Sequence, residues 1–331
     1  MHIFKNTNFD FLKYRWPAIA VSWIIILAGV FAIWTKGIPK GVEFAGGTVV
    51  ITQFDQGVSV QQVRAALDKT FPGGDTVVQS YGDPQQHQVM VRVPTTGQES
   101  GSSLSKTQDQ IKAALTQASL GNFKVVGSEI VGPIVGQELT RKGLLATFVS
   151  LFFILAYLAA RFQLSFGVGA VVATIHDLLI TLAFLAFFRY DLSLNVIAAI
   201  LTMTGYSTND TIVIFDRIRE NLRAMRRDNL DHVINVSINQ TLGRTVITSG
   251  TALLTALALF FFGGEVLHGF AFTMVVGIIT GTYSSVFIAA AIVSFWRGSG
   301  PARAAAHAPG SAAASLPPAA SRSKQRKARA S

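Results

Sequence analysis

Long apolar blocks dominate the pattern of this chain and alternate with short polar segments. Six of these blocks have roughly the 20 residues that an α-helix needs to cross the hydrocarbon core of a bilayer. They cover residues 17–35, 143–160, 166–188, 192–215, 245–262 and 269–295. The pattern therefore predicts an α-helical membrane protein with six transmembrane helices.

The segment between the first and second blocks, residues 36–142, has the pattern of a folded α+β domain. Runs rich in β-branched residues predict strands, and apolar residues three and four apart predict helices. The strands are expected at 48–54, 75–81, 87–93 and 122–131, and the helices at 59–71 and 104–119. The order βαββαβ is that of a ferredoxin-like domain. Residues 98–105, rich in Gly and Ser, predict a flexible loop.

The composition agrees with a membrane protein and narrows the chemistry. Half of the 331 residues are hydrophobic and only 14% are charged, whereas a soluble domain carries about a quarter charged residues. The chain has no cysteine, which excludes disulfides, thiolate metal sites and cysteine nucleophiles. The pairs Gly46-Gly47 and Gly73-Gly74 do not make a phosphate-binding loop. We expect neither a metal nor an organic cofactor.

The distribution of Lys and Arg predicts the orientation in the membrane. Basic residues gather in segments 1–16, 216–244 and 296–331, whereas the two short loops on the other side contain only Arg189. Both termini are therefore expected in the cytoplasm and segment 36–142 outside. The net charge of +10 follows from this bias and a basic tail. No basic stripe interleaved with aromatic residues indicates specific nucleic-acid binding.

Two of the basic segments have patterns of their own. In segment 216–244, Ile218, Leu222 and Met225 recur at helical spacing among arginines, which predicts an amphipathic helix on the cytoplasmic membrane surface. A plain solvated linker is the alternative. Segment 296–331 is rich in Ala, Pro, Ser, Arg and Lys, so we expect it to be disordered. Its basic residues suit anionic lipid or ribosomal RNA, or serve only as a solubilising end.

An aspartate inside the fourth block is the leading candidate for chemistry. Asp210 follows a polar run, and a carboxylate in hydrocarbon costs at least ~2.5 kcal/mol. Arg244 stands at the start of the fifth block and enters from the same side, so we expect the two to form an ion-coupling site. A static polar contact between the two helices is the alternative. The polar residues expected to line the site are Ser207, Thr208, Asn209, Thr248 and Ser249.

A second aspartate, Asp177, lies near the middle of the third block and follows His176. Adjacent residues point in different directions on a helix, so the two are not expected to pair. Asp177 is a candidate for an ion relay or for a hydrogen-bonded packing acid.

The last block has small residues about four apart, which let helices approach closely in lipid. They either pack the core of the bundle or form a seam with another protein. The small residues concerned are Gly277, Gly281, Ser284 and Ser285.

Several ordered motifs carry a resemblance to a known family. The segment GYSTNDTIVIFDRIREN at 205–221 resembles the fourth-span signature of SecF proteins in the SecD/SecF family. Four further stretches match in the same order: VEFAGGT at 42–48, VGPIVGQEL at 131–139, RTVITSGTALLTALAL at 244–259 and GTYSSVFIA at 281–289. Glu43 stands where the family usually has Asp.

The resemblance implies a six-helix half of a transporter of the resistance-nodulation-division type in the bacterial inner membrane. It implies SecD as the other half, the SecYEG channel and a translocating preprotein as partners, and a proton or sodium gradient as the energy source. Asp210 and Arg244 match the ion-coupling positions of the family. The resemblance implies a translocation subunit, not an enzyme.

Three other functions compete with this interpretation. An intramembrane aspartyl protease has Gly-x-Gly before its aspartate, whereas Ser-Thr-Asn precedes Asp210. An exporter half for small molecules or lipids would have a larger outer domain, and a structural scaffold would not need Asp210.

One charge crossing 100 mV releases about 2.3 kcal/mol, less than the ~5–15 kcal/mol that unfolds a domain. We therefore expect rigid-body tilting of residues 40–138.

Overall fold

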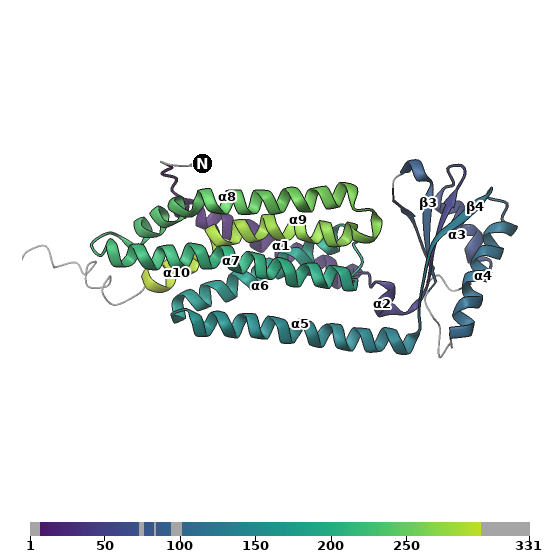
Figure 1. Cartoon of the computed structure of the whole chain (residues 1–331), viewed down its shortest axis with the longest axis horizontal. Helices are drawn as coiled ribbons and strands as arrows, with labels where there is room; N and C mark the ends of the chain where they lie inside the picture. The colour runs from purple at the N-terminus through teal and green to yellow at the C-terminus, as the bar shows by residue number, and fades with distance from the viewer. Residues whose placement is uncertain (1–6, 73–75, 83, 94–100, 299–331) are drawn as a thin grey trace, which may run out of the picture.

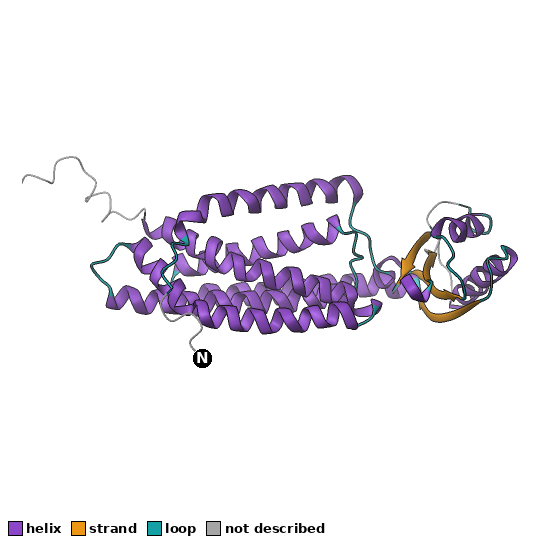
Figure 2. Cartoon of the chain, turned by 90° about the horizontal axis from the view of Figure 1, so that it is seen from above, coloured by secondary structure: helices purple, strands orange, loops and turns teal. Residues whose placement is uncertain are grey.

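A computed structural model describes the chain except residues 1–6, 73–75, 83, 94–100 and 299–331. Long helices form a bundle, and a small α/β domain stands at one end of it (Figures 1 and 2). The long helices are α1 (Arg15–Lys36), α5 (Pro133–Arg161), α6 (Leu164–Phe187), α7 (Leu194–Ala224), α8 (Leu230–Phe262) and α9 (Glu265–Ser284). A π-helical turn, η3 (Ser285–Ala289), joins α9 to α10 (Ala290–Gly298).

Five helical stretches in the described part of the chain are long and apolar enough to cross a membrane. They are Leu12–Lys36, Val135–Arg161, Leu164–Phe187, Leu230–Phe262 and Val266–Trp296. The remaining predicted block, 192–215, is helical from residue 194 onward as part of α7, but α7 is not among the five. Its polar run and its charged continuation beyond residue 215 lower its average hydropathy. A sixth span therefore stays a prediction.

The segment 216–244 differs from its prediction. It is helical except for residues 225–229, because α7 runs on to Ala224 and α8 begins at Leu230. The apolar spacing does mark a helix, but this helix continues α7. Ile218 is buried against Ile234 and Ile238 of α8 in the main core of the bundle. The apolar face is thus covered by protein, not by the membrane surface.

The domain contains four strands and two longer helices in the order β1 (Gly47–Phe54), α3 (Val60–Asp68), β2 (Val77–Tyr81), β3 (Gln88–Val93), α4 (Gly101–Gln117) and β4 (Phe123–Val131). The antiparallel sheet has the order β2-β3-β1-β4. Ser59 caps α3 through a capping box with Gln62. Of the predicted flexible loop 98–105, residues 98–100 lie outside the described residues. The rest is wrong, since α4 begins at Gly101.

Helices α3 and α4 cover the face of the sheet that is turned away from the bundle (Figure 1). Val50, Leu67, Val91 and Leu115 are among the side chains that form the core there. The other face is turned toward the bundle, with a short helix, α2 (Val42–Ala45), beside it. The domain is therefore built on one hydrophobic layer and keeps its second face for contacts with the bundle.

Two further predictions concern the ends of the second and last blocks. Helix α5 begins at Pro133, ten residues before the predicted block, because Gly132 ends β4 and proline is favoured at the first helical position. At the other end, α10 continues to Gly298. The predicted disordered basic tail then lies almost wholly outside the described residues.

Candidate functional site

Asp210 lies inside the bundle, with 8% of its surface exposed. Its Oδ1 accepts a hydrogen bond of 2.7 Å from the Thr245 hydroxyl on α8. Its Oδ2 is buried and has no hydrogen-bond partner among the described residues. A buried polar atom without a partner costs about 1–3 kcal/mol. This oxygen is therefore in place to take a proton or to face a cation.

Arg244 does not reach Asp210 in the way the sequence suggested. Its side chain is exposed, and no ion pair joins it to Asp210 within the described residues. Consecutive residues of an α-helix are rotated by about 100°. Since Thr245 faces Asp210, Arg244 is turned toward the outer surface of the bundle. The two residues come to neighbouring positions, but the direct contact is made by Thr245.

The five predicted lining residues divide into three groups. Asn209 and Thr248 are exposed on the outside of the bundle. Ser249 is buried and accepts a hydrogen bond of 2.7 Å from Thr282 on α9. The Thr208 hydroxyl is buried and has no partner among the described residues. The Ser207 hydroxyl donates a hydrogen bond to Asp177. None of them is a hydrogen-bond partner of Asp210.

Asp177 is 1% exposed and is fully hydrogen-bonded. Its Oδ2 accepts from the Ser207 hydroxyl of α7 at 2.5 Å and from the Ser284 hydroxyl of α9 at 2.9 Å. Its Oδ1 lies 3.0 Å from His176 Nδ1. The expectation that His176 and Asp177 do not pair is wrong, because both side chains are long enough to meet beside the helix. These contacts suit a packing acid that ties α6, α7 and α9 together.

The small residues of the last block lie against α7. A β-carbon on Gly277 would come within 2.5 Å of the Met203 sulfur, and one on Gly281 within 2.7 Å of the Ser207 β-carbon. Ser285 pairs with Thr211 at 2.8 Å. The glycines thus allow α9 to approach α7, Ser285 provides a polar contact to α7, and Ser284 provides one to Asp177 of α6. This arrangement belongs to the core of the bundle.

Sequence reasoning missed Thr245, whose hydroxyl donates a hydrogen bond to Asp210. The signal was available, because Thr245 and Ser249 are four residues apart and share a helix face. Thr248, which was predicted instead, falls on a different face. The apolar run that begins at Thr245 also made this residue look like part of a lipid-facing helix.

The outer face of α7 and α8 is unlike the rest of the bundle surface. Seven of its exposed positions hold small or polar side chains, although α8 also exposes Val246, Ile247 and Leu254: Thr202, Gly205, Asn209, Arg244, Thr248, Thr251 and Thr255. We refer to these seven positions as the polar face. By contrast, α5 exposes large apolar side chains such as Phe148, Phe152 and Phe153.

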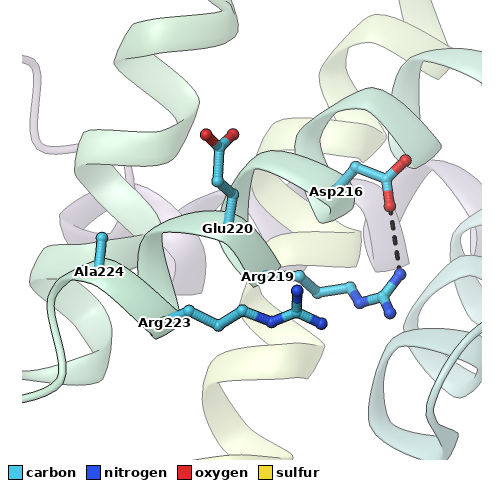
Figure 3. Close-up of a pocket in the computed structure, with 5 residues that line it drawn as sticks. All are labelled: Asp216, Arg219, Glu220, Arg223 and Ala224. Carbon is cyan, nitrogen blue, oxygen red and sulfur yellow. Dashed lines mark hydrogen bonds and ion pairs between the residues drawn. The ribbon is translucent and has the colours of Figure 1, made fainter.

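A cavity of about 530 Å³ lies near the end of α7 that is remote from the domain (Figure 3). Its lining comprises Ala224 and four charged side chains, with Asp216 paired to Arg219 at 3.3 Å. Asp216 is six residues from Asp210, or about 9 Å along the helix. The cavity's two acidic and two basic side chains balance in charge, and it lies beside the same helix that carries Asp210.

A second cavity, of about 780 Å³, separates the open face of the sheet from the end of the bundle. Glu43 and Glu129 both line it. Partial burial, and next the negative charge of Glu43, raise the pKa of the Glu129 carboxyl above its ordinary value. The described residues contain no group of three or more His, Cys, Asp and Glu side chains that could hold a metal ion.

Comparison with known proteins places the chain in a family. The family model described as protein export membrane protein SecD/SecF, C-terminal, matches residues 110–299, and the model of the SecD/SecF GG motif matches residues 31–58. The protein translocase subunit SecF of Desulfurispirillum indicum is 41% identical over 290 residues, 87% of this chain and 91% of the relative. That of Vibrio alginolyticus is 42% identical over 283 residues, 85% and 88% of the two chains.

Solved structures agree with these matches. SecDF of a Thermus species, a translocon-associated membrane protein, superposes with a TM-score of 0.77 at 35% identity over 90% of this chain. SecDF in a super-membrane-facing form superposes with a TM-score of 0.65 over 92%. The match covers only 40% of each SecDF chain. Five apolar helices, a four-stranded antiparallel sheet and these relatives lead to one conclusion. The chain belongs to the SecD/SecF family of protein export membrane proteins.

Proposed function

We propose that this chain is an accessory subunit of the Sec protein translocase in the bacterial inner membrane. Together with SecD, it uses the proton or sodium gradient to promote the export and release of proteins. The observation that carries the proposal is the buried Asp210 carboxylate, of which one oxygen has a single hydroxyl partner and the other has none among the described residues. The names of the relatives support the translocase role.

The proposed function requires a defined arrangement in the membrane. Helix α7 serves as the sixth span, both termini lie in the cytoplasm, and the domain, of the ferredoxin-like type, lies outside. The βαββαβ order and the strand order β2-β3-β1-β4 support this assignment of the domain. The cavity beside Asp216 then opens to the cytoplasm and provides a polar approach to Asp210.

The polar face of α7 and α8 supports the need for SecD. Polar side chains exposed to hydrocarbon are unfavourable, and small residues on a membrane helix suit close contact with another helix. The solved SecDF chains are more than twice as long as this chain. We infer that a SecD half covers the polar face. Arg244 would then be enclosed together with Asp210, near the interface between the halves.

The proposed cycle begins when Asp210 takes up a proton or a cation and ends when the ion leaves on the other side. Uptake neutralises the carboxylate and removes the cost of burying its charge, so the packing of α7 against α8 changes. A single charge crossing 100 mV provides about 2.3 kcal/mol. This free energy suits a shift between two poses of the domain and is too small to unfold it.

The test is Asp210→Asn in inverted membrane vesicles that contain SecD and the SecYEG channel. We expect export with an imposed gradient to fall to the level measured without a gradient, because asparagine cannot exchange a proton and carries no charge for a cation. The matched control is Asp177→Asn, the same change in a hydrogen-bonded acid. It should reduce the amount of folded protein and leave the gradient response per molecule. Full gradient-stimulated export by Asp210→Asn would contradict the proposal and favour a scaffold.

A further inference from the structure

The linker after α1 is fixed to the loop between α6 and α7 by backbone contacts. Lys40 and Leu192 form a parallel β-bridge. The Gly41 amide donates to the Leu192 carbonyl, and the Leu192 amide donates to the Pro39 carbonyl, each at 2.7 Å. A β-carbon on Gly41 would lie 3.0 Å from the Leu192 oxygen. The two segments are therefore so close that a side chain larger than that of glycine at position 41 would press against the Leu192 carbonyl.

Arg92 of β3 binds the domain to the same place. Its Nη1 donates a hydrogen bond of 2.7 Å to the Lys40 carbonyl, and its Nη2 forms an ion pair with the Asp191 carboxylate. The Arg92 side chain is only 10% exposed. A planar guanidinium can hold two such acceptors in a fixed geometry. One side chain thus joins the sheet, the linker after α1 and the loop before α7.

The loop side of this joint leads directly into the helix of the candidate site. Asp191 stands three residues before Leu194, the first residue of α7, and Ser193 caps the helix by accepting from the Val196 amide. Asp210 follows sixteen residues after Leu194, about 24 Å along the helix. No flexible segment separates the carboxylate from the joint, so a shift of α7 acts on Asp191 at once.

We propose that Arg92 is a positioning residue that transmits movement of α7 to the domain, through a joint with Asp191 and Lys40 that stays closed during turnover. This inference rests on the proposed function and adds the route of transmission. The domain then moves together with the start of α7. Opening the joint would leave the Arg92 guanidinium and five backbone groups without their partners, which is why the contact stays closed.

The first arm of the test is Arg92→Ala in full-length protein, in vesicles with SecD and SecYEG. We expect gradient-stimulated export to fall about tenfold, within the range of coupling between linked sites, while export without a gradient is unchanged. The matched control is Arg64→Ala, which removes an exposed arginine of α3 in the same domain. It should leave both activities at the wild-type level.

The second arm uses a disulfide, which is specific because the chain has no cysteine. The double variant Lys40→Cys with Leu192→Cys places two thiols on the β-bridge, where strands are about 4.8 Å apart, a spacing that suits a disulfide. Oxidation should preserve gradient-stimulated export. In the Arg92→Ala background it should not restore export, because the cross-link joins the linker to the loop and does not replace the bond from the sheet. A mere loss of stability at Arg92 would instead be offset by the cross-link, which restrains the same two segments.

Three outcomes would contradict the proposal that this joint transmits movement and stays closed. Wild-type stimulation in Arg92→Ala would show that Arg92 transmits nothing, and rescue of that variant by the disulfide would show that the bond from the sheet is not what was lost. Loss of export on oxidation of the double variant, reversed by reductant, would show that the joint must open. Asp210→Asn measured in parallel separates the two proposals. If it still loses its gradient response, the proposed function stands and only the joint is wrong.

Discussion

Asp210 and Asp177 are two buried aspartates on neighbouring helices, and the groups around them differ. Asp177 receives hydrogen bonds from two serine hydroxyls and lies beside a histidine nitrogen. Asp210 accepts a hydrogen bond from the Thr245 hydroxyl. Sequence could identify both acids, because charge inside an apolar block is conspicuous. It could not rank them by their partners, because Ser284 and Thr245 approach from helices whose rotation depends on packing along their whole length.

At the residue scale, Glu129 gives a prediction for pH dependence. Its pKa is raised in the folded protein, so the folded state holds a proton that the unfolded state releases. Stability from this carboxyl is therefore present below its ordinary pKa and falls as pH rises through the raised value. We expect Glu129→Gln to increase the thermal unfolding temperature of the full chain in detergent at pH 7, with little effect at pH 4.

The control for this prediction is Glu43→Gln, which removes the neighbouring negative charge. It should give a smaller increase at pH 7, since burial, the larger cause of the raised pKa, remains. An equal change at both pH values would show that Glu129 acts by packing and not by ionisation.

At the scale of elements, sequence predicted the existence of helices and strands well and their ends poorly. The strand predicted at 87–93 starts one residue before β3 and ends with it, and the helix predicted from residue 59 begins at Val60, with Ser59 as its cap. The end of α7 was predicted at residue 215 instead of 224, and the start of α8 at residue 245 instead of 230. Hydropathy marks where an apolar block stops, whereas Asn221 and Ile218 continue the helix through contacts with α8. Those contacts depend on the tertiary structure.

The interface of α7 with α9 gives the second prediction. Gly281→Ala would force a β-carbon to within 2.7 Å of Ser207, and overpacking of this kind costs about 1–3 kcal/mol. The control is Gly250→Ala in α8, where no atom lies within 4 Å of the new β-carbon. Thermal unfolding in detergent should show a lower midpoint for Gly281→Ala alone. Equal midpoints would mean that the helices separate without cost.

At the scale of the whole molecule, α5 and the polar face differ in the side chains that they expose. Helix α5 exposes phenylalanines, whereas the polar face on α7 and α8 exposes threonines, a glycine and Arg244. The sequence predicted a missing half only through family resemblance. The surface gives a physical reason for it, because hydrocarbon is a poor solvent for Arg244 and a second protein can provide partners for it.

The polar face gives the third prediction. Gly205→Trp adds a large side chain where no atom of the chain lies within 4 Å of the new β-carbon, so the isolated subunit should fold normally. If SecD covers this face, the amount of SecD that co-purifies with the tagged variant should fall several-fold. Ala146→Trp on the exposed side of α5 is the control and should retain SecD. Equal recovery of SecD with both variants would place the interface elsewhere.

The direct junction between β4 and α5 has a consequence for the surrounding lipid. Only Gly132 separates the last strand residue, Val131, from the start of α5, and α5 is covered by protein over very little of its length. A membrane helix answers a change in bilayer thickness by changing its tilt. With one residue between them, that tilt passes to the edge of the sheet. The resting angle of the domain should therefore depend on acyl-chain length, and thinner or thicker membranes should bias export without any mutation.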